Sequence, residues 1–449
     1  MKFIQTLKNI WTIQELRQRL TITVLLVLVY RLGCYVVLPG INPNDLDALT
    51  SFTNKSGLMQ LLDMFSGGAF SQASIFALGI MPYITASIVI QLAGMVLPSF
   101  QKMQREGESG RQKLNQYTRY LTVLILLVQG PAYLFNLRSQ VVNAGGSVEM
   151  GWLTVAFLTI ILAAGSMFIM WLGERITDRG IGNGISFIIL VGIIARLPIA
   201  LFYEFTSRLP GSNGSEGGLI MFIVEIVLLF AVTIGAVLLV QGTRKVPVQY
   251  AKRIVGNKQY GGARQYIPLK VNAAGVMPII FAQAIMFIPI TLAGFGAKEG
   301  STGFFATFSD INGFWYNLVY FVMIVAFTYF YTAITVRPTQ MAEEMKRNNG
   351  FIPGVKPGKK TAEYLDSIMS RITLPGSLFL GIVAILPAFA RCFGISQNFA
   401  QFFGGTSLLI MVGVVLDTLQ QIESHLMMHH YDGLMKDGKI KGRTTGSAY

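Results

Sequence analysis

The residue types that most often carry out catalysis are scarce in this chain of 449 residues and form no obvious set. All three histidines lie near the C-terminus, where the spacing of His425 and His429 would place both on one face of a helix. Two such imidazoles could share a metal ion, but no cysteine or further carboxylate is placed to complete the site, so a solvated tail is favoured. The glycine-rich residues 180–184 follow no strand and precede no Lys-Ser/Thr, which predicts a tight loop rather than a phosphate site. The sequence therefore predicts neither a metal, a cofactor nor an enzyme.

Ionisable residues within apolar runs are the second candidates for chemistry, because ion-coupled carriers use them. Arg31, Arg196 and Glu225 are of this kind. Arg196 and Glu225 lie towards the same side of the predicted membrane and either pair or extend separately to the interface. No carboxylate stands at the centre of a run. An ion-coupled secondary transporter of small solutes is therefore the alternative prediction, and it is disfavoured.

Ten apolar runs would position these residues, each near the roughly 20 residues that a bilayer span requires. The chain is 52% hydrophobic and 13% charged, with a mean hydropathy of +0.53, as in polytopic membrane proteins. The predicted spans are 20–38, 75–97, 120–137, 153–172, 185–202, 219–240, 273–293, 314–336, 372–390 and 402–419. The predicted fold class is an all-α membrane protein with ten transmembrane helices.

The distribution of basic residues predicts the orientation. With a cytoplasmic N-terminus, 29 of the 36 Lys and Arg residues fall on the cytoplasmic side. Both termini would then be cytoplasmic, and the first span, too long for a cleaved signal peptide, would be retained. Cys34 and Cys392 are interpreted as packing residues.

A short amphipathic piece at residues 58–65 precedes the second span. Gly67 and Gly68 separate the two, so a half-helix is expected to meet a full helix that starts at residue 74. Asp63 lies on a different face of the short piece from Phe65. The piece either enters a funnel within the protein or lies along the membrane surface.

Four residues of the second span form one stripe at helical spacing, namely Ile80, Ile84, Ser87 and Gln91. Its first half is apolar and its second half is polar. Such a stripe suits a helix that lines a partly wet path, although the two polar residues could equally be contacts between helices.

Two predicted cytoplasmic loops, 241–271 and 335–371, each contain seven basic residues. The first has no acidic residue, and tyrosines are interspersed among its charges. Positive-inside bias with attraction to anionic lipid, about 1 kcal/mol per charge, is one explanation. An acid-free loop with tyrosines more strongly favours docking onto RNA phosphates or an acidic protein.

Long motifs spread from the first loop to the last span resemble the protein-conducting channel family, which comprises the bacterial SecY translocon and its archaeal and eukaryotic counterparts. They are MFSGGAFSQASIFALGIMPYITASIVIQL (64–92), EGESGRQKLNQYTRY (106–120), MWLGERITDRGIGNGISFII (170–189), VPVQYAKR (246–253), PLKVNAAGVMP (268–278) and FGGTSLLI (403–410).

The resemblance implies two inverted five-helix halves around a central pore. They would comprise residues 1–209 and 219–423, with a hinge loop at 210–218 and a cytoplasmic tail at 424–449. The implied function is the central pore-forming subunit of the Sec protein translocase. Such a channel passes unfolded secretory polypeptides across the bacterial inner membrane and releases transmembrane segments sideways through a lateral gate.

The resemblance also assigns residues by motif. A ring of aliphatic side chains, which seals by excluding water, falls on Ile80, Ile84, Ile189, Ile280 and Ile410. A plug half-helix falls on residues 58–73 and includes Leu61, Asp63, Met64, Phe65, Ser66, Gly67 and Gly68. The lateral gate falls on Thr85, Ser87, Gln91, Gln129 and Asn272.

The implied partners are the ribosome, the SecA motor ATPase, SecE-like and SecG-like small subunits, unfolded preprotein with its signal sequence, and membrane lipids. Ribosome and motor would dock on Arg244, Lys245, Lys252, Arg253, Lys258, Arg264, Lys356, Lys359 and Lys360. The family commonly has Ile-Arg-Pro-Gly where this chain has Val355-Lys356-Pro357-Gly358. Lysine keeps the charge there but loses the bidentate geometry of arginine.

Overall fold

The computed structural model describes residues 13–41, 63–143, 151–209, 218–250, 253–255, 258–260, 264–283, 285–286 and 313–436. The chain divides into two compact units. Unit 1 comprises Met1–Arg196 and Val414–Tyr449, and unit 2 comprises Leu197–Gly413. Unit 1 therefore contains residues from both ends of the sequence.

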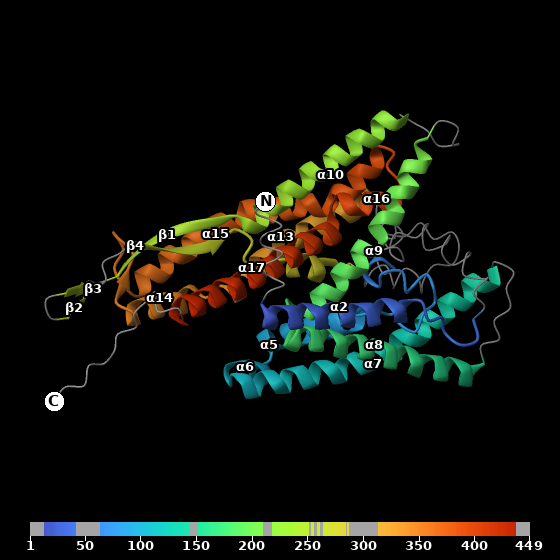
Figure 1. Cartoon of the computed structure of the whole chain (residues 1–449), viewed down its shortest axis with the longest axis horizontal. Helices are drawn as coiled ribbons and strands as arrows, with labels where there is room; N and C mark the ends of the chain where they lie inside the picture. The colour runs from blue at the N-terminus through green and yellow to red at the C-terminus, as the bar shows by residue number, and fades with distance from the viewer. Residues whose placement is uncertain are drawn as a thin grey trace. The chain divides into compact units, whose positions relative to one another are not determined.

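Unit 1 consists of packed helices (Figure 1). α7 packs against α5, α6 and α8, and α2 packs against α8. The helices are α2 (Gln14–Cys34), α5 (Met81–Val96), α6 (Pro98–Arg105), α7 (Glu108–Asn143), α8 (Trp152–Arg179), the first part of α9 (Gly184–Ser207) and the second part of α17 (Gly405–Lys436).

Unit 2 combines helices with a small antiparallel sheet. α13 packs against α15, and α10 packs against α15 and η2. Its helices, besides the remaining parts of α9 and α17, are α10 (Gly218–Gln241), α13 (Phe314–Thr335), α14 (Pro338–Arg347), α15 (Lys359–Cys392), α16 (Gln397–Ala400) and η2 (Gln401–Phe403). Residues 277–283 and 285–286 are also helical, within the seventh predicted span.

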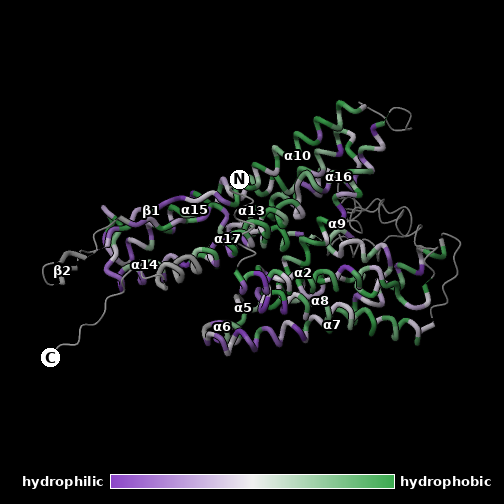
Figure 2. Tube along the Cα trace, viewed as in Figure 1, coloured by the Kyte–Doolittle hydropathy of each residue, from purple (hydrophilic) through white to green (hydrophobic). Residues whose placement is uncertain are grey.

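Seven helices among the described residues are long and apolar enough to cross a membrane, and α5 with α6, bent by 102°, would make an eighth. Figure 2 shows their predominantly hydrophobic character. α2, in the first predicted span, is not among these seven helices. It contains four charged residues, Glu15, Arg17, Arg19 and Arg31, which lower its mean hydropathy. The multi-pass, almost entirely helical fold agrees with the prediction, and the total of ten spans stays a prediction.

The second predicted span starts later than expected. Residues 66–80 form successive turns, and helix α5 begins at Met81, with Ile80 as its N-cap and Pro82 in its first turn. The backbone has positive φ at Gly67, Gly68, Ala73 and Gly79, which is incompatible with a continuous helix. The prediction of one helix from residue 74 was therefore wrong.

Several helices extend beyond their apolar runs. α7 begins at Glu108 and α15 begins at Lys359, each about three turns before the predicted span. α17 continues to Lys436, so His425 lies on the same helix as the last predicted span. Hydropathy reports where a helix can enter the membrane, whereas polar residues with good helix propensity continue it into water.

The first predicted basic loop contains β-strands, which the sequence analysis did not predict. β1 (Thr243–Tyr250) pairs antiparallel with β4 (Arg264–Lys270), and β2 (Arg253–Val255) pairs with β3 (Lys258–Tyr260) between them. β5 (Gly350–Phe351), from the second basic loop, pairs with the end of β1 to give the order β4-β1-β5. Val246 and Val248 alternate with exposed residues along β1, as a half-buried strand requires.

Candidate functional site

The predicted plug is buried in unit 1. Residues 63–70 are all buried, but only residues 63–65 are helical; Leu61 and the start of the predicted half-helix lie outside the described residues. Burial of Asp63 together with Met64 and Phe65 is inconsistent with a segment lying along the membrane surface. The segment of residues 63–80, called the plug segment below, is thus an internal element.

A charged contact holds the start of the plug segment. The guanidinium of Arg196, on α9, forms an ion pair with the Asp63 carboxylate and donates a hydrogen bond to Ser71 Oγ at 2.8 Å. The second carboxylate oxygen accepts the Ser71 backbone N–H at 2.8 Å. Arg196 therefore pairs with Asp63, and the alternative pairing with Glu225 is wrong.

Helix α2 supplies a second set of contacts. Arg31 Nη1 donates to the carbonyl oxygen of Gly67 at 2.9 Å, and the Tyr30 hydroxyl donates to that of Ser66 at 3.1 Å. Backbone carbonyls left free by the turn are thereby satisfied within the protein. Cys34 is buried beside them, as predicted, whereas Cys392 is exposed, so its interpretation as a packing residue was wrong.

The glycine pair permits this close approach. φ is +66° at Gly67 and +95° at Gly68, which favours glycine. A Cβ on Gly67 would lie 2.9 Å from Arg31 Nη1 and from the Gly192 Cα, and one on Gly68 would lie 2.9 Å from Arg196 Nη2. Larger residues here would separate the segment from both arginines.

Apolar packing holds the later part of the plug segment. Phe70, Ala73 and Ala77 belong to a core shared with α7 and α8, and the Tyr133 hydroxyl donates to the Phe70 carbonyl at 3.0 Å. The N–H of Ile75 donates to Val36 O at 2.9 Å, in an isolated antiparallel bridge. The segment is thus held by charge at its start and by apolar contact afterwards.

The electrostatics of Asp63 reflect two opposing effects. Burial raises the pKa of its carboxyl, and the charge of Arg196 and the hydrogen bonds from Ser71 oppose that rise. Arg196 is the group whose removal would leave this carboxylate buried without a cation.

Three of the predicted ring residues belong to unit 1 and two belong to unit 2. In unit 1, Ile80 and Ile189 are buried and Ile84 is half-buried, and the Ile84 N–H donates to Ile80 O at 3.1 Å. In unit 2, Ile280 is half-buried and Ile410 is buried. Ile80 is the last residue of the plug segment, so the segment leads into the predicted ring.

The predicted gate residues make mostly local contacts. Thr85 donates to Met81 O at 3.0 Å, and Gln91 contacts Ser87 at 3.4 Å along α5. Gln129 is half-buried on α7. Asn272 lies in the turn before the helical residues 277–283, and among the described residues its buried Oδ1 has no hydrogen-bond partner.

A second buried charge cluster, in unit 2, was not predicted. Arg208 donates to Glu204 Oε1 at 3.1 Å, to Glu225 Oε1 at 2.8 Å and to the Gly394 carbonyl at 2.8 Å. The other oxygen of Glu204 accepts the Ser396 N–H at 3.2 Å. The cluster fastens α9 and α10 to the segment before α16. The i, i+4 spacing of Glu204 and Arg208 was a signal for part of it.

The two predicted docking loops form one module. Val246, Val248 and Leu269 from the hairpin pack with Met345, Ile352, Leu365 and Met369 from the second loop and α15. Side chains of Arg244, Lys245, Lys356, Lys359 and Lys360 are exposed on it. Arg253, Lys258 and Arg264 lie on strands β2, β3 and β4, and Lys252 lies outside the described residues.

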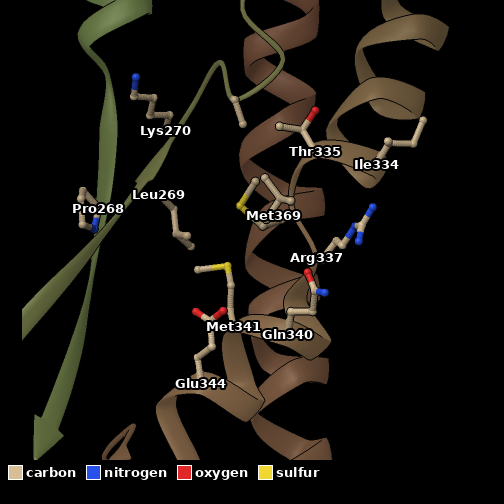
Figure 3. Close-up of a pocket in the computed structure, with 12 residues that line it drawn as sticks. Pro268, Leu269, Lys270, Ile334, Thr335, Arg337, Gln340, Met341, Glu344 and Met369 are labelled. Atoms are coloured by element: carbon tan, nitrogen blue, oxygen red, sulfur yellow. The ribbon is translucent and has the colours of Figure 1, made fainter. Parts of the chain in front are cut away.

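A cavity of about 610 Å³ opens where this module meets the end of α13. Leu269, Met341 and Met369 face it, with Arg337 and Glu344 at its edge (Figure 3). Within the described parts of the chain no cluster of three or more His, Cys, Asp or Glu side chains could hold a metal ion.

Residues 180–184 form the predicted tight loop before α9. Gly182 has φ +81°, and its N–H donates to Gln421 Oε1 of α17 at 2.8 Å. The N–H of Ile181 donates to Thr23 Oγ1 of α2 at 3.2 Å. Helices from the two ends of the sequence thus hold one loop within unit 1.

Comparisons with known proteins match nearly the whole chain. The SecY family model matches residues 74–419. A protein translocase subunit SecY from Streptomyces coelicolor is 42% identical over 436 residues, covering 94% of this chain and 97% of the relative. One from Chlamydia muridarum is 41% identical over 456 residues, covering 98% and 99%.

Solved structures match the fold. One described as a protein conducting channel has a TM-score of 0.63 and 19% identity, covering 91% of this chain and 92% of its own. A second, concerned with the plug domain of the SecY protein, matches to the same extent, with a TM-score of 0.63 and 19% identity. Sec61 in a canine ribosome-channel complex has a TM-score of 0.58 and 18% identity, with the same coverage.

Proposed function

This chain belongs to the SecY family of protein translocase subunits, and from that premise we propose how its residues close the pore, open it and bind its partners. The chain is a multi-pass membrane protein and the pore-forming subunit of the Sec translocase. The proposed location is the bacterial inner membrane, with both termini in the cytoplasm, and the proposed activity is transport without catalysis.

The proposed seal consists of the plug segment and the ring. Burial of residues 63–70, followed in the chain by buried Ile80, is the observation that carries this proposal. Ile80, Ile84, Ile189, Ile280 and Ile410 would surround a translocating polypeptide. Aliphatic side chains suit this role because they exclude ions by dewetting and form no hydrogen bonds to the passing chain.

The proposed lateral gate uses Thr85, Ser87, Gln91, Gln129 and Asn272. Asn272 supports the proposal best, because its buried amide oxygen lacks a partner among the described residues. Such an oxygen is satisfied when a donor approaches, and interhelical hydrogen bonds of this kind average about 0.6 kcal/mol in one membrane protein. Contacts that weak would let a hydrophobic signal helix open the gate.

The cytoplasmic module is the proposed docking surface for the ribosome and a SecA-like motor. Its exposed lysines and Arg244 lie on elements that share one apolar core, so they are fixed relative to one another. A solved relative is described in a complex with the ribosome. SecE-like and SecG-like subunits, signal-bearing preprotein and lipids complete the proposed set of partners.

Site-specific crosslinking tests the ring. Cysteine at Ile84 should form a disulfide with cysteines along a stalled secretory chain, in a background where Cys34 and Cys392 are replaced by serine. Val89 provides a matched control, because it is exposed on the same helix. Crosslinks at Val89 but not at Ile84, or none at either while a small solute is transported, would contradict the proposed pore.

A further inference from the structure

We infer that Arg31 and Arg196 form an arginine clamp that sets how tightly the plug segment closes the resting channel. The inference rests on the proposed role of the plug segment and adds the residues that regulate it. Arg31 binds the Gly67 carbonyl and Arg196 binds Asp63 and Ser71, so the two arginines contact both sides of the glycine pair.

The clamp acts on only one part of the plug segment. Residues 69–77 are anchored by the core shared with α7 and α8, and by the bridge at Val37 and Ser74. Residues 63–68 lie outside that core, and their charged contacts with other elements come from the two arginines, Arg31 at the Gly67 carbonyl and Arg196 at Asp63. Release would therefore move the start of the segment about Gly67 and Gly68, while the later part stays in place.

The two partners of the ion pair differ in exposure. The Asp63 side chain is 9% exposed, whereas that of Arg196 is 30% exposed, and its Nε has no partner among the described residues. Loss of Arg196 would leave a buried carboxylate without a cation, whereas loss of the Asp63 charge would leave a guanidinium that water can reach. Arg196 should therefore matter more than Asp63.

The test measures ion leakage through the complete translocase complex in proteoliposomes without substrate. Arg196→Gln should raise the leak about tenfold, which corresponds to about 1.4 kcal/mol. Arg196→Lys should give an intermediate value, because it keeps the charge but replaces the planar guanidinium with a compact, more strongly hydrated ammonium group. Asp63→Asn combined with Arg196→Gln should leak less than the sum of the two single effects.

A matched control comes from an arginine pair in the same unit. Arg119 Nη2 donates to both oxygens of Glu174, at 2.7 and 2.8 Å, and joins α7 to α8 without touching the plug segment. Arg119→Gln removes the same kind of charge and should leave the leak unchanged. An equal leak in both variants would overturn the clamp, because loss of any arginine–carboxylate pair would then be enough to cause the leak.

Amide hydrogen exchange provides the second readout. Arg196→Gln should increase exchange at residues 63–68 more than at residues 69–77. Unchanged exchange at residues 63–68 would overturn the clamp. Increased exchange without leakage would also overturn it as a regulator of closure.

A deletion separates failure of the clamp from failure of the plug role. Removal of residues 63–68 should raise the leak at least as much as Arg196→Gln. If the deletion leaks and Arg196→Gln does not, the clamp is wrong and the plug role stands. If neither leaks, the proposed plug role fails, and the clamp that rests on it fails with it.

Discussion

Among the residues that the structure describes, each of the two units has one arginine–carboxylate cluster with buried carboxylates, and the two clusters differ in how completely they exclude water. In unit 2, the side chain of Arg208 is 4% exposed and those of Glu204 and Glu225 are 1% exposed. In unit 1, Arg196 is 30% exposed beside a nearly buried Asp63. The cluster around Arg208 joins three segments, whereas the contact of Arg196 holds one short segment.

This difference in exposure suits the Arg208 cluster to a permanent contact and the Arg196–Asp63 pair to a contact that can be released. Opening a fully buried cluster leaves several buried charges without their partners at the same time, which is strongly unfavourable. An arginine already in contact with water can exchange its carboxylate for hydration at much lower cost. Similar ion pairs thus serve different purposes according to their surroundings.

The largest effect, a loss of thermal stability, is expected from Arg208→Leu. Two carboxylates would stay buried without their cation, and loss of one partner of a buried pair typically costs about 3–5 kcal/mol of stability. Thermal unfolding of the purified complex should shift strongly downwards. Arg138→Leu is the control, since Arg138 is exposed on α7. Equal thermal stability of both variants would show that the cluster in unit 2 is dispensable.

The second prediction concerns pH in the Arg196→Gln variant. Burial raises the pKa of Asp63, so the clamped state binds a proton more tightly than the released state does. Acidification through that raised pKa should therefore reduce the leak of Arg196→Gln, because protonated Asp63 tolerates burial without a cation. Arg31, Tyr30, Cys34 and Tyr133 are the other ionisable groups around this site.

The control for the pH prediction is the double variant Asp63→Asn with Arg196→Gln. It lacks the titrating carboxyl, so its leak should not respond to pH in the same range. A leak of the single variant that grows on acidification would contradict the assigned sign.

A smaller effect is expected from Asp63→Asn alone. The amide oxygen can still accept the Ser71 N–H, and the half-exposed guanidinium of Arg196 can be hydrated. Partly exposed pairs contribute about 0.2–1 kcal/mol, so the leak should rise by less than about fivefold. A larger leak than that of Arg196→Gln would reverse the proposed asymmetry.

Asn272→Leu extends the comparison to a buried polar group without charge, and it should have the smallest effect. Leucine cannot accept the hydrogen bond proposed to form when a donor approaches Asn272 Oδ1, and a bond worth about 0.6 kcal/mol should shift gate opening by about threefold. The measurement is the minimum signal-sequence hydrophobicity that supports export. Gln129→Leu provides a comparison on α7, and an unchanged threshold in Asn272→Leu would remove Asn272 from the gate.

Long apolar runs made the membrane-spanning character predictable, because burial in lipid requires them whatever the packing. Helix ends were less predictable, as the extensions of α7 and α17 show. The break at Gly67 and Gly68 was predicted from the glycine pair, whereas Gly79 was read as part of the span because hydropathy outweighed its signal. The hairpin of β1 to β4 was missed although alternation along β1 and the Gly256-Asn257 pair between β2 and β3 indicated it.

Contacts at long sequence separation were beyond prediction from one sequence. Asp63 and Arg196 are 133 residues apart, and no local pattern connects them. Glu225 was identified as an unusual charge, but Arg196 was the only partner considered for it, whereas the structure pairs it with Arg208. Roles of the ring and gate residues came from resemblance and stay predictions, since an isoleucine in a helix carries no signature of a pore.

The bond between Gly182 and Gln421 has a consequence for the timing of biosynthesis. It spans 239 residues, and both partners belong to unit 1. At about 5–20 residues per second, Gln421 is synthesised roughly 10–50 seconds after the loop it completes. During that interval the loop before α9 lacks its final contact while all of unit 2 is being made. Unit 1 therefore begins to fold first and is completed last.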